Sequence, residues 1–208
     1  MSILDTVYLR QVLDSLYGFF ARRYLDTSML SIPYYYMEKA RVYDKKDVEA
    51  IAFLSAIYDY QMRVGTLRNH FIKMIDTLVD HGLRLNDLSM ESVYRGVFDK
   101  FLKDIGFFHR FDPCGEAVPW ILRAVYNIDL EYVASRSSEP DRALVKALWS
   151  ELKRYWSMIP CSARVRVKRV IPRPDTRSPL KRINLFLRWM VRDEYPDLVY
   201  GGVLISLD

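Results

Sequence analysis

Cysteine and histidine are scarce in this chain. Two cysteines, Cys114 and Cys161, are too few for a disulfide framework or for a cluster held by four thiolates. The three histidines, His70, His81 and His109, stand far apart and lack the spacing of metal ligands. We therefore expect no metal, no cofactor and a reducing, cytoplasmic setting.

Long hydrophobic runs are also absent. No apolar stretch approaches the roughly 18–20 residues that a membrane helix needs. The start of the chain has an acid at Asp5 and lacks both a basic region and a small-residue cleavage site, so it does not predict a signal peptide. With 208 residues, half of them hydrophobic, and few glycines and prolines, the composition is that of a globular protein with a sizeable core.

Apolar residues recur at helical spacing through most of the chain. With Asp47 and Asp141 as N-caps and with Gly82 and Gly106 ending two of the segments, the pattern predicts helices over about 5–24, 47–58, 67–79, 93–105, 118–125, 141–156 and 178–192. On the second of these, Val48, Ile51, Ala52, Ser55 and Tyr58 form the apolar face and Glu49 lies off it. Since no run of strands accompanies the helices, the expected fold class is all-α.

Two intervals depart from the helical pattern. Arg164-Val165-Arg166-Val167-Lys168 alternates basic and apolar residues, which favours a short strand, a basic ribbon or an extended loop that buries its valines. Ser31-Ile32-Pro33 and the tyrosines at 34–36 interrupt the helical rhythm near the N-terminus. These tyrosines either pack half-buried between helices or stack on nucleic acid bases.

Positive charge is concentrated in one part of the chain. Between Cys161 and Arg192 there are ten basic residues and a single acid, Asp175, a net charge of +9. Because the whole chain carries +5, the rest of it carries −4. This asymmetry indicates either a solvated basic face or a surface for nucleic acid.

The last predicted helix carries the clearest local signals. Ser178 is placed as its N-cap and Pro179 as its first residue, where the missing N–H costs no hydrogen bond. Ile183, Phe186, Leu187 and Met190 form an apolar stripe on it. Lys181 falls in the first turn, where it either contacts a phosphate or water, or acts in its neutral form as a nucleophile that forms a Schiff base.

Four segments of this chain resemble one family. KRINLFLRWMVR (181–192) is similar to the signature segment of a largely uncharacterised bacterial and archaeal family of the helix-hairpin-helix DNA glycosylase superfamily, whose best-known member is endonuclease III. The segment 44–68 resembles the family's N-terminal helical motif, and FHRF (108–111) resembles its Tyr-Arg-Phe-like block. The final residues, 204–208, resemble the Leu-Ile-Pro-Leu-Asp that precedes Asp-Thr-His in the family.

The resemblance implies a fold and a chemistry. It implies a helix-hairpin-helix, glycosylase-like domain in which Lys181 attacks C1′ of a flipped nucleotide and Asp208 stabilises the developing positive charge on the sugar. The basic hairpin would hold the flanking phosphates of a damaged duplex. The residues expected to bind nucleic acid are Arg164, Arg166, Lys168, Arg169, Arg173, Arg177, Arg182 and Asn184.

The sequence departs from the family pattern at three places. The stretch 172–178 has no glycine where a hairpin turn usually has them, and Leu180 replaces a cysteine. The chain stops at Asp208, where the family continues with Thr-His and further helices. We therefore expect a domain that lacks its C-terminal helices, divided into a helical part (1–160) and a basic hairpin, signature helix and shortened catalytic segment (161–208). It is either a truncated or frameshifted reading of a longer gene or a shortened relative without catalysis.

Two other functions are compatible with the same residues. A non-enzymatic module would bind DNA or RNA through the basic segment without performing chemistry. A helical protein-interaction domain would use apolar surface around Phe186, Leu187 and Met190 for a partner or a second copy of the chain.

Overall fold

The computed structural model describes residues 28–41, 44–89, 102–175 and 180–191, and in these ranges it is helical and contains no strand. The expected all-α class is confirmed. The helices are α2 (Ser31–Ala40), α3 (Lys45–Tyr58), α4 (Val64–Asp80), the 3₁₀ turn η1 (Leu85–Ser89), α7 (Val118–Tyr126), α8 (Leu130–Ser135), α9 (Pro140–Arg154), α10 (Cys161–Val170) and α11 (Lys181–Val191).

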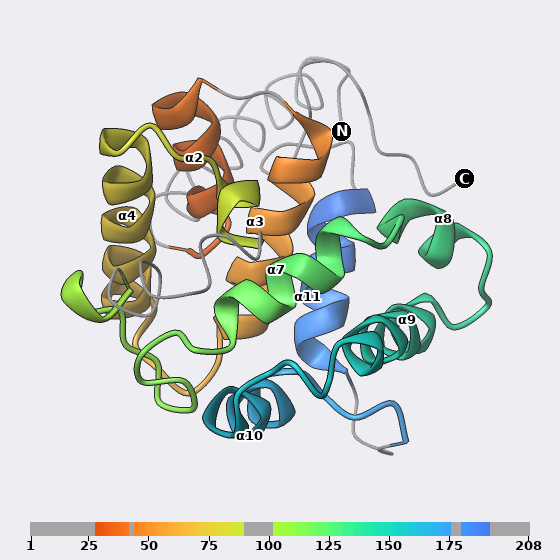
Figure 1. The fold of residues 1–208 in the computed structure, drawn as a ribbon. Coiled ribbons are helices and arrows are strands. Elements are labelled where there is room, and N and C mark those ends of the chain that lie inside the picture. The colour runs from red at the N-terminus through yellow and green to blue at the C-terminus, as the bar shows by residue number, and fades with distance from the viewer. Residues whose placement is uncertain (1–27, 42–43, 90–101, 176–179, 192–208) are drawn as a thin grey trace, which may run out of the picture.

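Helix α3 forms the centre of the molecule. It packs against α2, α7 and α11, while α4 lies outside α2, and α9 contacts both α7 and α11 (Figure 1). Every residue of α3 from Asp47 to Tyr58 is buried, including Glu49, so the prediction that Glu49 lies off the buried face is wrong. A helix covered on all sides has no solvent face, and the Glu49 carboxylate is instead paired with Lys46 at 3.2 Å.

Aromatic side chains fill the space between α3 and its neighbours. The rings of Phe53 on α3 and Phe186 on α11 meet edge to face, with 5.2 Å between their centroids. Tyr58, at the end of α3, contacts Phe71 and Phe107 in the same geometry. Such pairs are favoured by the ring quadrupoles in addition to burial, so they hold α4 and α11 onto the central helix.

Several helix boundaries agree with the sequence pattern and two N-caps do not. The helices predicted over 67–79 and 118–125 are confirmed as α4 and α7, and Gly82 follows α4 with φ +67°. Helix α3 is capped by Asp44, which accepts from the backbone N–H groups of Lys46 and Asp47. Asp47, the predicted cap, is buried and accepts from the hydroxyls of Tyr36 and Tyr126.

The N-cap predicted at Asp141 is also wrong, by two residues. Helix α9 begins at Pro140 with Glu139 in the N-cap position, and Asp141 lies in its first turn. Proline at the first helical position loses no hydrogen bond, so the helix starts before the aspartate.

Two further corrections concern intervals predicted to be non-helical. Residues 164–168 form neither strand nor extended loop but the middle of α10, with Ala163, Val167 and Val170 buried on one side. The spacing of these three residues is helical, and packing on this face overrides the local alternation of bases and valines. Residues 31–40 form α2, where Tyr36 is fully buried and Tyr34 and Tyr35 are partly buried, so the packing alternative for the tyrosines is the correct one.

Some predictions fall outside the described residues. These are the helix over 5–24, most of the helix over 93–105, the start signal Ser178-Pro179, Arg177 and Asp208. In the part of the chain that the structure describes, no helix is long and apolar enough to cross a membrane.

Candidate functional site

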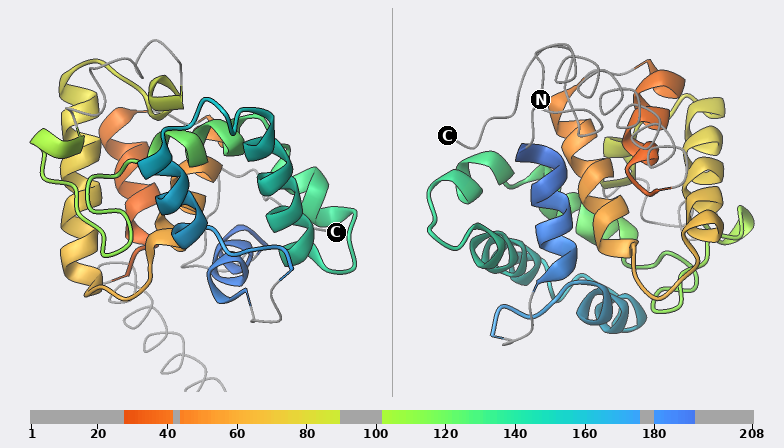
Figure 2. Two further views of the ribbon diagram at one scale, coloured as in Figure 1. Left: turned by 60° about the horizontal axis from the view of Figure 1, so that its bottom comes forward. Right: turned by 180° about the vertical axis from the view of Figure 1, so that it is seen from behind.

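A pocket of about 550 Å³ lies where the first turn of α11 meets the end of α3. Lys181, the first residue of α11, has an exposed side chain and lines this pocket. The remaining lining residues are Asp59, Tyr60, Pro172, Leu180, Arg182 and Leu185. Seen from two directions, the start of α11 lies next to α10 and the connection between them (Figure 2). Pro172, which follows α10, lines the pocket, so the pocket borders the connection that leads from the basic helix to α11.

Arg182 joins the two helices that form the pocket. Its Nη1 donates a 2.9 Å hydrogen bond to the carbonyl oxygen of Ile57, in the last turn of α3, where carbonyl groups lack partners within the helix. Its guanidinium lies 4.9 Å from the ring centroid of Tyr60. Burial lowers the pKa of Arg182 from its ordinary value, but an arginine remains charged at neutral pH. This cation thus holds the start of α11 against the end of α3.

A buried histidine, His109, forms a hydrogen bond with the loop after α3. His109 has no exposed surface, and its Nε2 lies 3.0 Å from the carbonyl oxygen of Tyr60. Its Nδ1 accepts from the backbone N–H of Phe111 at 3.3 Å. Because a carbonyl only accepts, Nε2 carries the proton and the ring is neutral, in agreement with the burial that lowers the pKa of His109. The Tyr60 ring stacks on Phe111, with 5.8 Å between centroids.

A buried carboxylate secures the same loop. The hydroxyl of Tyr58 donates to Oδ2 of Asp112 at 2.6 Å, and the backbone N–H of Ala117 donates to the same oxygen at 3.0 Å. Burial raises the pKa of Asp112 to about 6. The segment from His109 to Asp112, which includes the last three residues of the FHRF block, therefore supports Tyr60 and is not part of the pocket wall.

Asp59 is the carboxyl group of the pocket. It follows the last residue of α3, and burial raises its pKa above the ordinary value. Among the described residues, neither the Asp59 carboxylate nor the Lys181 amine makes a hydrogen bond or an ion pair. Sequence reasoning missed Asp59 and Tyr60, because nothing in the sequence indicates that the end of α3 meets a helix more than 100 residues later.

The bases predicted to bind nucleic acid occupy different environments. Arg164 is partly buried, and its Nε donates to the carbonyl oxygen of Ile159 at 2.7 Å. Lys168 and Arg169 are exposed, and the Lys168 amine lies 5.5 Å from the Trp156 ring centroid. Arg166 is partly exposed. Arg166, Lys168 and Arg169 thus lie at the surface of α10, a helix that contains no acid. Arg164 differs from them because its hydrogen bond to Ile159 also stabilises the fold.

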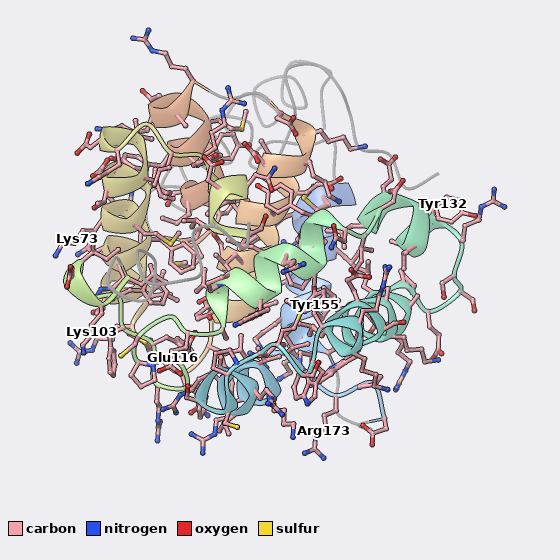
Figure 3. The ribbon with its side chains drawn as sticks, viewed as in Figure 1. Lys73, Lys103, Glu116, Tyr132, Tyr155 and Arg173 are labelled. Atoms are coloured by element: carbon pink, nitrogen blue, oxygen red, sulfur yellow. The ribbon has the colours of Figure 1, made fainter. Side chains whose placement is uncertain are left out.

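Two other predicted residues lie near α10 and α11. Arg173, in the connection between these helices, is exposed and projects at the lower edge of the molecule (Figure 3). Asn184, one turn into α11, is exposed, and its Nδ2 donates to Oδ2 of Asp141 at 3.3 Å. Arg182, Lys181 and Asn184 are therefore brought together on the first turn of α11, and Arg173 lies on the approach to it.

Comparison with known proteins gives one match. The family model described as "Protein of unknown function (DUF2400)" matches residues 36–202. The chain belongs to the DUF2400 family. The DUF2400 region extends from within α2 past the end of α11, so it includes Asp59, Lys181 and the whole basic helix but not Asp208. No curated protein and no solved structure matches the chain.

The DUF2400 chain has a second pocket, of about 260 Å³, at the start of α10. Lys103, Cys114, Glu116 and Ser162 are among its lining residues. One carboxylate oxygen of Glu116 is buried without a hydrogen bond partner. Within the described ranges, no group of three or more histidine, cysteine, aspartate or glutamate side chains is arranged to hold a metal ion.

Proposed function

We propose that this DUF2400 protein is a DNA-binding protein of the DNA glycosylase-like, base-excision class. In this proposal, α10 and the connection after it bind the DNA backbone, and the pocket at α11 receives one unstacked nucleotide. The observation that carries the proposal is the position of Lys181. Its exposed amine lines a pocket of about 550 Å³ next to a helix with four bases and no acid.

The size and the charge of the site support this assignment. Pockets for small ligands and single nucleotides measure roughly 300–1,000 Å³, so one flipped nucleotide fits. Extrusion of a nucleotide from a duplex requires that the flanking phosphates be held, and exposed lysines and arginines on α10 are suited to this. Tyr60, which is 42% accessible, adds exposed aromatic surface at the pocket.

The order of the helices along the chain also supports the proposed glycosylase-like function. Helix α10, a proline-containing connection and α11 follow one another, as a helix-hairpin-helix unit requires. The resemblance of 181–192 to a glycosylase signature segment assigns the nucleophile to Lys181, the first residue of the second helix. A neutral lysine amine forms a Schiff base with the aldehyde of an abasic sugar.

The binding part of the proposal is tested by charge neutralisation. Fluorescence anisotropy with a labelled duplex that contains one abasic-site analogue gives the affinity at a series of salt concentrations. For Lys168→Gln/Arg169→Gln, we expect weaker binding and a slope of log K against log salt that is smaller by about 1–2, since each lost phosphate contact removes about 0.9 from the slope. Arg164 is kept, because its hydrogen bond to Ile159 supports the fold.

The matched control is Lys39→Gln/Lys73→Gln, which removes the same charge from α2 and α4. Lys73 projects from α4 at the left edge of the molecule, away from Arg173 at its lower edge (Figure 3). We expect this control to bind like the wild-type chain. Equal losses in the two double variants would show that only net charge matters, and an unchanged affinity of the α10 variant would overturn the proposed interface. Competition by an RNA duplex that equals that of DNA would favour an RNA-binding module instead.

A further inference from the structure

The pocket at α11 is lined by the carboxyl group of Asp59. The family resemblance implied a different aspartate, Asp208, for this chemistry. Asp59, at the end of α3, and Lys181, at the start of α11, line the same pocket. The charged and titratable groups that line it are Asp59, Tyr60, Lys181 and Arg182. Arg182 is engaged with Ile57 and with the Tyr60 ring, whereas the Asp59 carboxyl and the Lys181 amine line the pocket without a hydrogen bond or ion pair to any described residue.

From this placement we infer that Asp59 is the proton donor of the site, acting on the sugar intermediate that Lys181 forms with an abasic nucleotide. This inference rests on the proposed function and adds a catalytic residue to it. A proton donor must be close to the reacting oxygen, and a carboxyl group in the pocket of the nucleophile meets this condition.

The step that Asp59 would assist is the loss of water. The neutral Nζ of Lys181 adds to C1′ of the ring-opened abasic sugar, an aldehyde, and the carbonyl oxygen takes a proton from the nitrogen, which gives a carbinolamine. The Asp59 carboxylic acid then protonates the hydroxyl group and the C–O bond breaks. Water leaves, and the nitrogen lone pair forms the C=N bond of an iminium ion. The carboxylate that remains lies beside this cation and stabilises it.

The environment of Asp59 agrees with this role. Burial raises its pKa, so a larger share of the group is protonated near neutral pH than for an ordinary aspartate. No described residue forms an ion pair or a side-chain hydrogen bond with it, so no structural partner accounts for a half-buried carboxyl at this position. Replacement by asparagine therefore removes a proton donor without breaking a contact that supports the fold.

The test is reductive trapping on the full chain. The wild-type protein, Lys181→Gln, Asp59→Asn and Asp59→Glu are incubated with a duplex that contains one abasic site, in the presence of cyanoborohydride, and the covalent adduct is followed over time at several pH values. Asp80→Asn is the matched control, because this exposed aspartate lies at the other end of α4, about 24 Å along the helix from the pocket side. Affinity for the same duplex is measured separately by anisotropy.

We expect Lys181→Gln to form no adduct and Asp59→Asn to form it about 100-fold more slowly, with affinity within twofold of the wild type. The wild-type rate should fall at high pH as Asp59 loses its proton, and Asp59→Asn should lack this fall, whereas Asp59→Glu should regain part of the rate. A rate and pH profile of Asp59→Asn equal to those of the wild type would overturn the role of Asp59 and leave the proposed function standing. If the wild type forms no adduct, or Lys181→Gln forms it equally, the lysine chemistry fails and the inference fails with it.

Discussion

The guanidinium of Arg182 lies 4.9 Å above the ring of Tyr60 and also donates to the carbonyl oxygen of Ile57. This one side chain attaches the first turn of α11 to the C-terminal end of α3. Arg182 and Tyr60, which are held together by this contact, both line the pocket between the two helices. A cation at the C-terminal end of a helix is also favoured by the helix dipole. The residue was expected to contact DNA, and the structure gives it this internal position.

Removal of this connection should destabilise the fold. We expect Arg182→Ala to lower the free energy of unfolding by about 2 kcal/mol, because a charged hydrogen bond to a backbone carbonyl is lost. Arg188→Ala, which removes an exposed arginine from the same helix, should change it by less than about 0.5 kcal/mol. Urea unfolding followed by circular dichroism gives both values. Equal stabilities of the two variants would contradict the structural role of Arg182.

The buried carboxyl of Asp112 should make stability depend on pH. Burial raises its pKa to about 6 from an ordinary value of 3.8, so the folded chain binds this proton more tightly than the unfolded chain. Its contribution therefore favours folding below about pH 4 and is lost as the pH rises to about 6, in total about 3 kcal/mol. Asparagine does not ionise, so Asp112→Asn does not lose this stability as the pH rises. Its amide oxygen still accepts the hydrogen bond from the Tyr58 hydroxyl.

The measurement for Asp112 is the difference in unfolding free energy between variant and wild type at about pH 4 and about pH 7. We expect this difference to shift in favour of Asp112→Asn by about 2–3 kcal/mol over that interval. Taking the difference removes the contributions of other acids with raised pKa values, such as Glu49 and Asp59. A difference that does not change with pH would show that the pKa of Asp112 in the folded chain is not raised above its ordinary value.

Gly115 should tolerate no side chain. Its φ is +67°, and a Cβ at this position would lie 2.4 Å from Cδ1 of Leu102 and 3.1 Å from Cδ1 of Phe107. We expect Gly115→Ala to cost about 2 kcal/mol or more, since backbone strain and overpacking add. Gly82 has the same φ of +67° and open space around it, so Gly82→Ala should cost only about 1 kcal/mol. Similar melting temperatures for the two variants would contradict the close packing at Gly115.

The Asp44 side chain should stabilise the N-terminus of α3 through the oxygen that accepts from the backbone N–H groups. We expect Asp44→Ala to destabilise the protein by about 1 kcal/mol and Asp44→Asn by a few tenths, because asparagine accepts the same backbone N–H bonds. Thermal unfolding measures both. If alanine and asparagine have equal effects at this position, the carboxylate does not act as a cap.

The sequence by itself determined the all-α class and the position of most core-facing helices. The spacing of apolar residues on α4 and α7 shows which face is buried, and His81-Gly82 marks the end of α4, because these signals act within a few residues. The concentration of bases between Cys161 and Arg192 and the presence of Lys181 in a helix start are properties of the sequence as well.

Only the tertiary structure decided which residues share a pocket with Lys181. Asp59 and Lys181 are more than 100 residues apart, and their meeting depends on α11 packing along α3 through Phe53 and Phe186. The helical state of 164–168 also needed this context, because alternation of bases and valines suits a strand locally, while burial of Ala163, Val167 and Val170 stabilises a helix. Contacts between distant segments carry no local signal, and they place the carboxyl group, the cation and the aromatic ring around one lysine.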